Sequence, residues 1–134
     1  MNKKWFLIIS CFAVLILIVS CKKNPFDYRT KYIGDYDFVN SWTSYNMSAT
    51  PPTSSGITYS TGKIDYGKDG MVNIIFDNNF PTFVAELKID RDGNLSFTNG
   101  LKAGQCQSRK KMHYSYSGGG LGGGSTSSIT GTKK

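Results

Sequence analysis

The sequence predicts an all-β protein, and three observations support that class. Fifteen Gly and only four Pro occur in 134 residues, beside many Ser, Thr, Asn and Tyr, a composition that favours strands joined by tight turns. After residue 30 no apolar stripe with a 3.6-residue period is long enough for a helix. Apolar and polar residues alternate instead, between turns rich in Gly, Asn and Asp. We therefore expect one β-domain at residues 31–134, large enough for a single hydrophobic core.

Eight strands follow from this alternation. They lie around residues 35–38, 57–66, 71–76, 82–89, 94–98, 101–109, 112–116 and 127–132. A polar loop is expected at residues 41–55, and Gly62 indicates a bulge in the second strand. Asn99-Gly100 is the strongest hairpin signal. The glycine-rich residues 118–124 predict a flexible loop before the last strand.

Eight short strands in sequence order close most simply into an antiparallel up-and-down barrel, in which the last strand pairs with the first. An open two-sheet sandwich is the alternative, because a strand count does not fix topology. Alternation directs several aromatic side chains inward: Tyr36, Phe38, Tyr59, Phe76, Phe83, Phe97, Tyr114 and Tyr116. That aromatic volume favours a filled core in a short barrel.

Residues 1–20 have the layout of a secretory signal peptide. Lys3 and Lys4 precede an apolar run at residues 5–19, and the small residue Ser20 follows. The run is shorter than the roughly 20 residues that a transmembrane helix needs. We therefore expect this leader to be cleaved after export.

The sequence Leu-Ile-Val-Ser-Cys at residues 17–21 resembles the lipobox of bacterial lipoproteins. The resemblance implies that Cys21 is lipidated and becomes the first residue of the mature chain, with residues 21–30 as a tether. Acyl chains contribute about 0.8 kcal/mol per buried methylene, so two or three of them hold a protein firmly on a bilayer. We expect a lipid-anchored protein of the bacterial cell envelope, in the outer membrane. An ordinary signal peptide before an unrelated cysteine is the alternative.

Charge and cysteine content exclude several functions. The net charge of the whole chain is +7. Removal of Lys3 and Lys4 with the leader leaves 14 basic and nine acidic residues. This excess of positive charge is mild and scattered, so it does not predict a nucleic-acid partner. Once Cys11 leaves with the leader and Cys21 is lipidated, Cys106 has no disulfide partner. We expect it to be a small buried side chain, because a catalytic thiolate requires a nearby histidine.

No pattern of catalytic or metal-binding residues emerges. Asp90, Asp92 and Asn94 are spaced like the first ligands of a calcium loop, but Leu95 stands where that loop needs glycine, so a hairpin turn is expected. His113 is the only histidine and cannot form a zinc site alone. We expect no enzyme activity, no metal site and no cofactor.

The start of the β-domain, Lys-Tyr-Ile-Gly-Asp-Tyr-Asp-Phe at residues 31–38, is similar to the Gly-x-Trp opening of lipocalins, with Tyr36 in place of the tryptophan. Over residues 31–134 the chain resembles the small lipocalin-like (calycin) lipoproteins of Gram-negative bacteria. This resemblance implies a barrel with an apolar interior, sometimes with a pocket for a small ligand, and no catalytic residues. The missing tryptophan, the lack of a disulfide and the short domain argue against a roomy cavity.

Two functions remain. The first is a lipid-anchored lipoprotein whose non-catalytic barrel binds a small apolar or amphipathic ligand. Trp42, Tyr45 and Tyr66 are the candidate ligand-binding residues, because they adjoin polar loops where aromatic rings can stack on a ligand. The alternative is a structural or protein-interaction module of the outer membrane with a filled barrel. The polar loop at residues 41–55 and the outward apolar pair Ile75 and Val84 motivate this second function.

Overall fold

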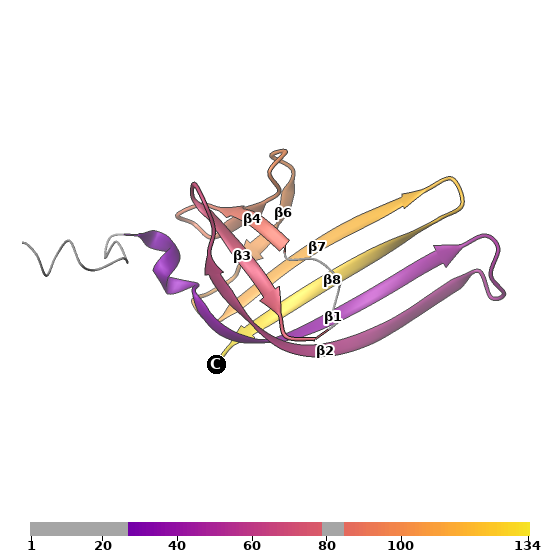
Figure 1. The fold of residues 1–134 in the computed structure, drawn as a ribbon, viewed down its shortest axis with the longest axis horizontal. Coiled ribbons are helices and arrows are strands. Elements are labelled where there is room, and N and C mark those ends of the chain that lie inside the picture. The colour runs from indigo at the N-terminus through magenta and orange to yellow at the C-terminus, as the bar shows by residue number, and fades with distance from the viewer. Residues whose placement is uncertain (1–26, 79–84) are drawn as a thin grey trace, which may run out of the picture.

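The computed structural model describes residues 27–78 and 85–134, so the predictions for the leader, Cys21, Phe83 and Val84 lie outside the described residues. The elements are η1 (Tyr28–Lys31), β1 (Gly34–Asn46), β2 (Thr53–Tyr66), β3 (Met71–Phe76), β4 (Ala85–Ile89), β5 (Asn94–Ser96), β6 (Lys102–Cys106), β7 (Lys111–Gly120) and β8 (Gly123–Lys133). Each strand pairs with the next, and β8 pairs with β1 to close the barrel (Figure 1). The predicted all-β, eight-stranded, antiparallel up-and-down barrel is confirmed.

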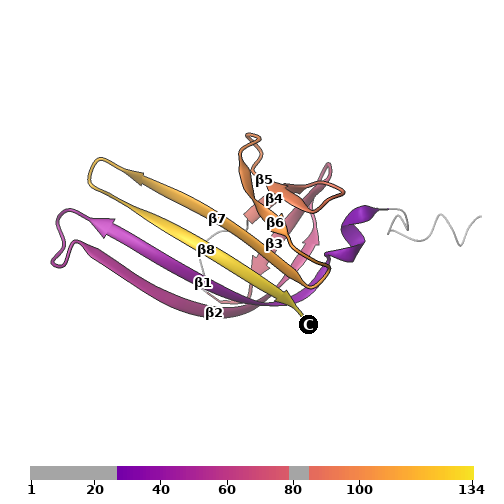
Figure 2. The ribbon, with the colours of Figure 1, turned by 180° about the vertical axis from the view of Figure 1, so that it is seen from behind.

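Two long hairpins, β1–β2 and β7–β8, continue past the barrel. β1 pairs with β2 over its whole length as far as Tyr45↔Thr53, and with β8 as far as Asn46↔Gly123. By contrast, β2 pairs with β3 only from Gly62 onward, and β7 pairs with β6 only at residues 112–114. The four strands therefore form a sheet beyond the barrel, called the arm below: residues 41–46, 53–60, 115–120 and 123–128. Both views show it projecting from one end of the molecule (Figures 1 and 2).

The arm corrects two loop predictions. Most of the predicted polar loop at 41–55 is strand, and the predicted glycine loop at 118–124 lies almost wholly in β7 and β8. The tips are joined as well, because the amide of Met47 donates to the carbonyl of Gly122 at 3.1 Å. Ser, Thr and Gly carry little apolar periodicity, yet pairing with neighbouring strands supplies backbone hydrogen bonds that a loop would lack.

The predicted bulge at Gly62 is also wrong. Gly62 pairs in unbroken register with Tyr36 of β1 and Phe76 of β3. A Cβ at this position would overlap the carbonyl oxygen of Ile75, so the glycine permits a close approach of β3. Because no extra residue shifts the alternation, Tyr59 faces outward and is 74% exposed, contrary to its predicted inward position.

Side chains from all eight strands form a hydrophobic core inside the barrel. Its largest buried members are Tyr36, Tyr114, Phe38, Ile64, Ile74, Leu87, Leu95, Met112, Ile129 and Val72. Phe76, Phe97 and Tyr116 are partly buried and pack against this core, and Cys106 lies within it. The predicted burial of Cys106 is confirmed.

The short helix η1 covers the end of the barrel opposite the arm (Figure 1). Nη1 of Arg29 donates to the carbonyls of Gly67 at 3.0 Å and Met71 at 2.7 Å, across the β2–β3 turn. The Tyr28 hydroxyl donates to the carbonyl of Ile89 in β4 at 2.8 Å. The folded domain therefore begins within residues that the sequence assigned to the tether.

Candidate functional site

The three predicted ligand-binding aromatics lie at three separate places. Trp42 is on the arm, on the same face of β1 as the core residue Phe38, whereas Tyr45 is on the opposite face of that strand. Tyr66 lies at the far end of the barrel, where its ring is 5.1 Å from the Arg29 guanidinium carbon and its hydroxyl is 2.8 Å from Thr30 Oγ1. The structure therefore does not bring them together in one site.

The Trp42 side chain lies on the inward face of the arm. Its cross-strand neighbours are Gly56 on β2 and Ser127 on β8. A Cβ on Gly56 would come within 2.8 Å of the indole atom Cζ2, so the missing side chain makes room for the ring against the sheet. The partly buried indole thereby offers an apolar surface next to the end of the barrel core.

The interior becomes polar where the core meets the arm. Asn40 follows Phe38 by two residues and lies on the same face of β1. It is only 5% exposed. Asn40 pairs with Ile129 on β8, and Ile129 pairs with Tyr114 on β7, so Asn40 and Tyr114 lie in one row across three strands. Ser60 and Ser127 are buried in the neighbouring rows. We call the buried groups Asn40, Ser60, Tyr114 and Ser127 the polar layer.

Two atoms of the polar layer are buried without a hydrogen-bond partner among the described residues: Oδ1 of Asn40 and the hydroxyl of Tyr114. Leaving such a group unpaired costs about 1–3 kcal/mol. Burial, and secondarily the neighbouring Tyr116, raise the pKa of Tyr114, so its phenol is neutral and can donate. Tyr36 provides the contrast, because its buried hydroxyl donates to the carbonyl of Tyr32 at 2.8 Å.

One unpaired acceptor and one unpaired donor suit a hydroxyl, an amide or another small polar group. The adjacent Trp42 and Tyr116 suit an apolar portion of the same molecule. Sequence reasoning missed Asn40 as a site residue, although an asparagine at an inward position beside Phe38 was a detectable signal.

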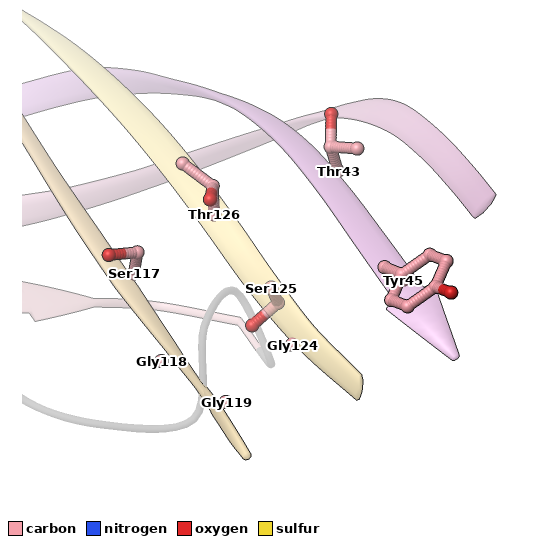
Figure 3. Close-up of a pocket in the computed structure, with 8 residues that line it drawn as sticks. All are labelled: Thr43, Tyr45, Ser117, Gly118, Gly119, Gly124, Ser125 and Thr126. Atoms are coloured by element: carbon pink, nitrogen blue, oxygen red, sulfur yellow. The ribbon is translucent and has the colours of Figure 1, made fainter. Parts of the chain in front are cut away.

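A hollow lies on the face of the arm opposite Trp42. It is an open groove of about 530 Å³ that crosses β1, β8 and β7 (Figure 3). Its lining contains no charged residue: Thr43, Tyr45, Ser117, Gly118, Gly119, Gly124, Ser125 and Thr126. Tyr45 is 47% exposed and pairs with Gly124, which in turn pairs with Gly119, so its ring stands beside two residues without side chains.

The predicted turn at residues 90–93 is confirmed. The Asp90 carboxylate accepts hydrogen bonds from the amides of Asp92 and Asn94 and from the Asn94 side chain, which lowers the pKa of Asp90. His113 is partly buried, with Nδ1 3.4 Å from Thr130 Oγ1. Within residues 27–78 and 85–134 no group of three or more His, Cys, Asp or Glu side chains is arranged to hold a metal ion. In the same ranges no helix is long and apolar enough to span a membrane.

Comparison with protein-family models, with curated proteins and with solved structures finds no match to this chain. The fold therefore defines the class of protein by itself: an eight-stranded, antiparallel, closed up-and-down β-barrel, an architecture consistent with a lipocalin-like fold.

Proposed function

We propose that the mature chain is a lipid-anchored envelope lipoprotein whose lipocalin-like, non-catalytic barrel binds a small amphipathic ligand at the polar layer. The lipobox-like residues 17–21 support an anchor at Cys21. η1 lies at the end of the barrel opposite the arm (Figure 1), and an anchor attached before η1 would direct the arm away from the bilayer.

The unpaired Oδ1 of Asn40 and hydroxyl of Tyr114 carry this proposal. Both groups lose their hydrogen bonds with water when the protein folds. A ligand with a complementary polar group would restore those hydrogen bonds. The packed core below them restricts the ligand to the junction of barrel and arm. Its apolar part would lie against Trp42 and Tyr116.

The test is to isolate the full chain from bacterial envelopes, extract it with organic solvent and identify bound molecules by mass spectrometry. Asn40→Leu and Tyr114→Phe keep the approximate shape of each side chain and remove the polar atom. We expect a bound molecule in the unmodified protein and its loss in both variants. Tyr36→Phe is the matched control and should retain the ligand, because its hydroxyl is already paired. An unmodified protein that carries nothing, or variants that retain the molecule fully, would refute the proposal.

The alternative, a protein-interaction module with a filled barrel, is favoured by one observation. Both arm tips expose apolar side chains, with Met47 64% and Leu121 fully exposed, beside the groove at Tyr45. Crosslinking in intact cells distinguishes the two functions. A defined envelope partner crosslinked to the arm, together with an empty polar layer, would favour the alternative over ligand binding.

A further inference from the structure

The open groove beside Tyr45, called the arm groove below, contains a row of three hydroxyl groups (Figure 3). Thr43 of β1 pairs with Thr126 of β8, and Thr126 pairs with Ser117 of β7. Neighbouring strands lie about 4.8 Å apart, so the three side chains form an evenly spaced line on one face of the sheet. Within residues 27–78 and 85–134 no hydrogen bond engages any of these hydroxyls, so each can pair with a ligand.

One aromatic ring stands beside this row. Tyr45 follows Thr43 by two residues on the same face of β1, and it is 47% exposed. Its cross-strand neighbour is Gly124, which pairs in turn with Gly119. Neither glycine has a side chain, so a ligand can approach the backbone closely beside the ring and still reach the hydroxyl row.

The arm contains no charged residue. Residues 38–62 and 112–132 include no Asp, Glu, Lys or Arg. A charged ligand would lose hydration in the groove without gaining an ion pair. A wholly apolar ligand would cover the hydroxyl row and leave it unpaired, and the exposed apolar side chains of Met47 and Leu121 do not line the groove. The groove therefore favours a neutral ligand that has both hydroxyl groups and an apolar face.

We propose that the arm groove binds a neutral saccharide. A sugar ring presents C–H groups on its face, which pack against an aromatic ring such as that of Tyr45, and hydroxyl groups around its rim. The hydroxyls of Ser and Thr both donate and accept hydrogen bonds, as those of a sugar do, so the two sets are matched. The groove is open and has a volume of about 530 Å³, which allows a longer glycan chain to continue beyond it.

This site is separate from the polar layer. Tyr45 and Trp42 lie on opposite faces of β1, so a saccharide in the arm groove and a ligand beside Trp42 would contact different surfaces of the same sheet. Saccharide binding therefore does not depend on a ligand at the polar layer.

The test is saturation-transfer NMR with the full chain, purified from the envelope in a detergent that has no sugar headgroup. The probes are maltopentaose, cellopentaose, mannopentaose and the pentamer of N-acetylglucosamine. We expect transfer to at least one of these neutral oligosaccharides. Titration of that sugar should show about tenfold weaker binding for Tyr45→Ala and about fivefold weaker binding for Thr126→Val, which keeps the side-chain shape.

Tyr59→Ala is the matched control. Tyr59 is 74% exposed and lies on the same face of the sheet as Tyr45, but it does not line the groove. Its removal should leave the dissociation constant unchanged. Asn40→Leu should also leave it unchanged, because Asn40 belongs to the polar layer. Protection of the buried Cys106 from maleimide shows that each variant has folded.

Three results would overturn the proposal. The first is the absence of transfer to every neutral oligosaccharide, or binding confined to an acidic glycan such as polygalacturonate. The second is equal affinity of the Tyr45→Ala and Tyr59→Ala variants for the sugar, which would place binding outside the groove. The third is loss of sugar binding in Asn40→Leu with retention in Tyr45→Ala, which would assign the sugar to the polar layer.

Discussion

Replacing Tyr114 by Phe should stabilise the ligand-free protein, whereas the same change at Tyr36 should destabilise it. Both side chains are buried in the barrel, at 0% and 1% exposure. The Tyr114 hydroxyl has no hydrogen-bond partner within residues 27–78 and 85–134, but the Tyr36 hydroxyl donates to the carbonyl of Tyr32 at 2.8 Å. Each substitution removes one hydroxyl oxygen. In Tyr36 that oxygen is hydrogen-bonded to a described residue, and in Tyr114 it is not.

The expected magnitudes follow from the cost of unpaired groups. Tyr114→Phe removes a buried hydroxyl that costs about 1–3 kcal/mol when unpaired, so the free energy of unfolding should rise by about 1 kcal/mol. Tyr36→Phe loses a hydrogen bond and leaves the Tyr32 carbonyl without it, so the free energy of unfolding should fall by about 1 kcal/mol. At about 2.1 cal/mol/K per residue, each change moves the melting temperature of this domain by about 4 °C.

Urea denaturation of solvent-extracted protein measures both values, provided that the slope m stays the same among the variants. Equal destabilisation by the two substitutions would refute the reasoning, because Tyr114 would then have a partner in the free protein. A ligand that pairs with Tyr114 reverses the sign for that variant: with ligand present, Tyr114→Phe should become the less stable protein.

Four further predictions concern the rest of the barrel. Arg29→Ala removes two charge-assisted hydrogen bonds to carbonyls at the β2–β3 turn and should lower the free energy of unfolding by about 1.5–3 kcal/mol in urea titrations. Gly62→Ala forces β3 away and should cost about 1–3 kcal/mol in the same assay, whereas no loss would contradict the close approach. Burial raises the pKa of the Cys106 thiol to about 11, above the pKa in the unfolded chain. The stability that this thiol contributes is therefore present below about pH 9 and is lost as the pH rises through 11. Alkylation of Cys106 in the native protein at pH 8 should be slow. The side-chain hydrogen bond from Arg29 lowers the pKa of Asp27, so stability should fall as the pH drops below about 4, and Asp27→Asn should reduce that dependence in acid titrations.

Alternation in the sequence was sufficient to predict the barrel, its strand order and the pairing of β8 with β1. It failed where side chains are small and polar. Ser, Thr and Gly predominate at residues 41–46, 53–56 and 117–126, so the pattern there does not distinguish a paired strand from a loop. The neighbouring strands decide. Tyr59 was misplaced for a related reason, since an expected bulge at Gly62 reversed the assignment of faces along β2.

The candidate site was less predictable than the fold. Trp42 was identified from its residue type, but its position over Gly56 depends on the β1–β2 register. Asn40 and Tyr114 are distant in sequence and lie in one row because β8 pairs with both β1 and β7, with Ile129 between them. This alignment arises because the barrel closes through pairing of β8 with β1. A single sequence does not reveal which side chains that pairing aligns.

The most direct test of ligand binding at the polar layer is a crystal structure of the full chain purified from the envelope without solvent extraction. The decisive observation is the electron density between Asn40 Oδ1 and the Tyr114 hydroxyl. We predict a non-protein molecule with polar atoms at about 2.5–3.2 Å from both groups and an apolar portion against Trp42. An interior in which protein side chains or single ordered waters satisfy both groups would contradict the account.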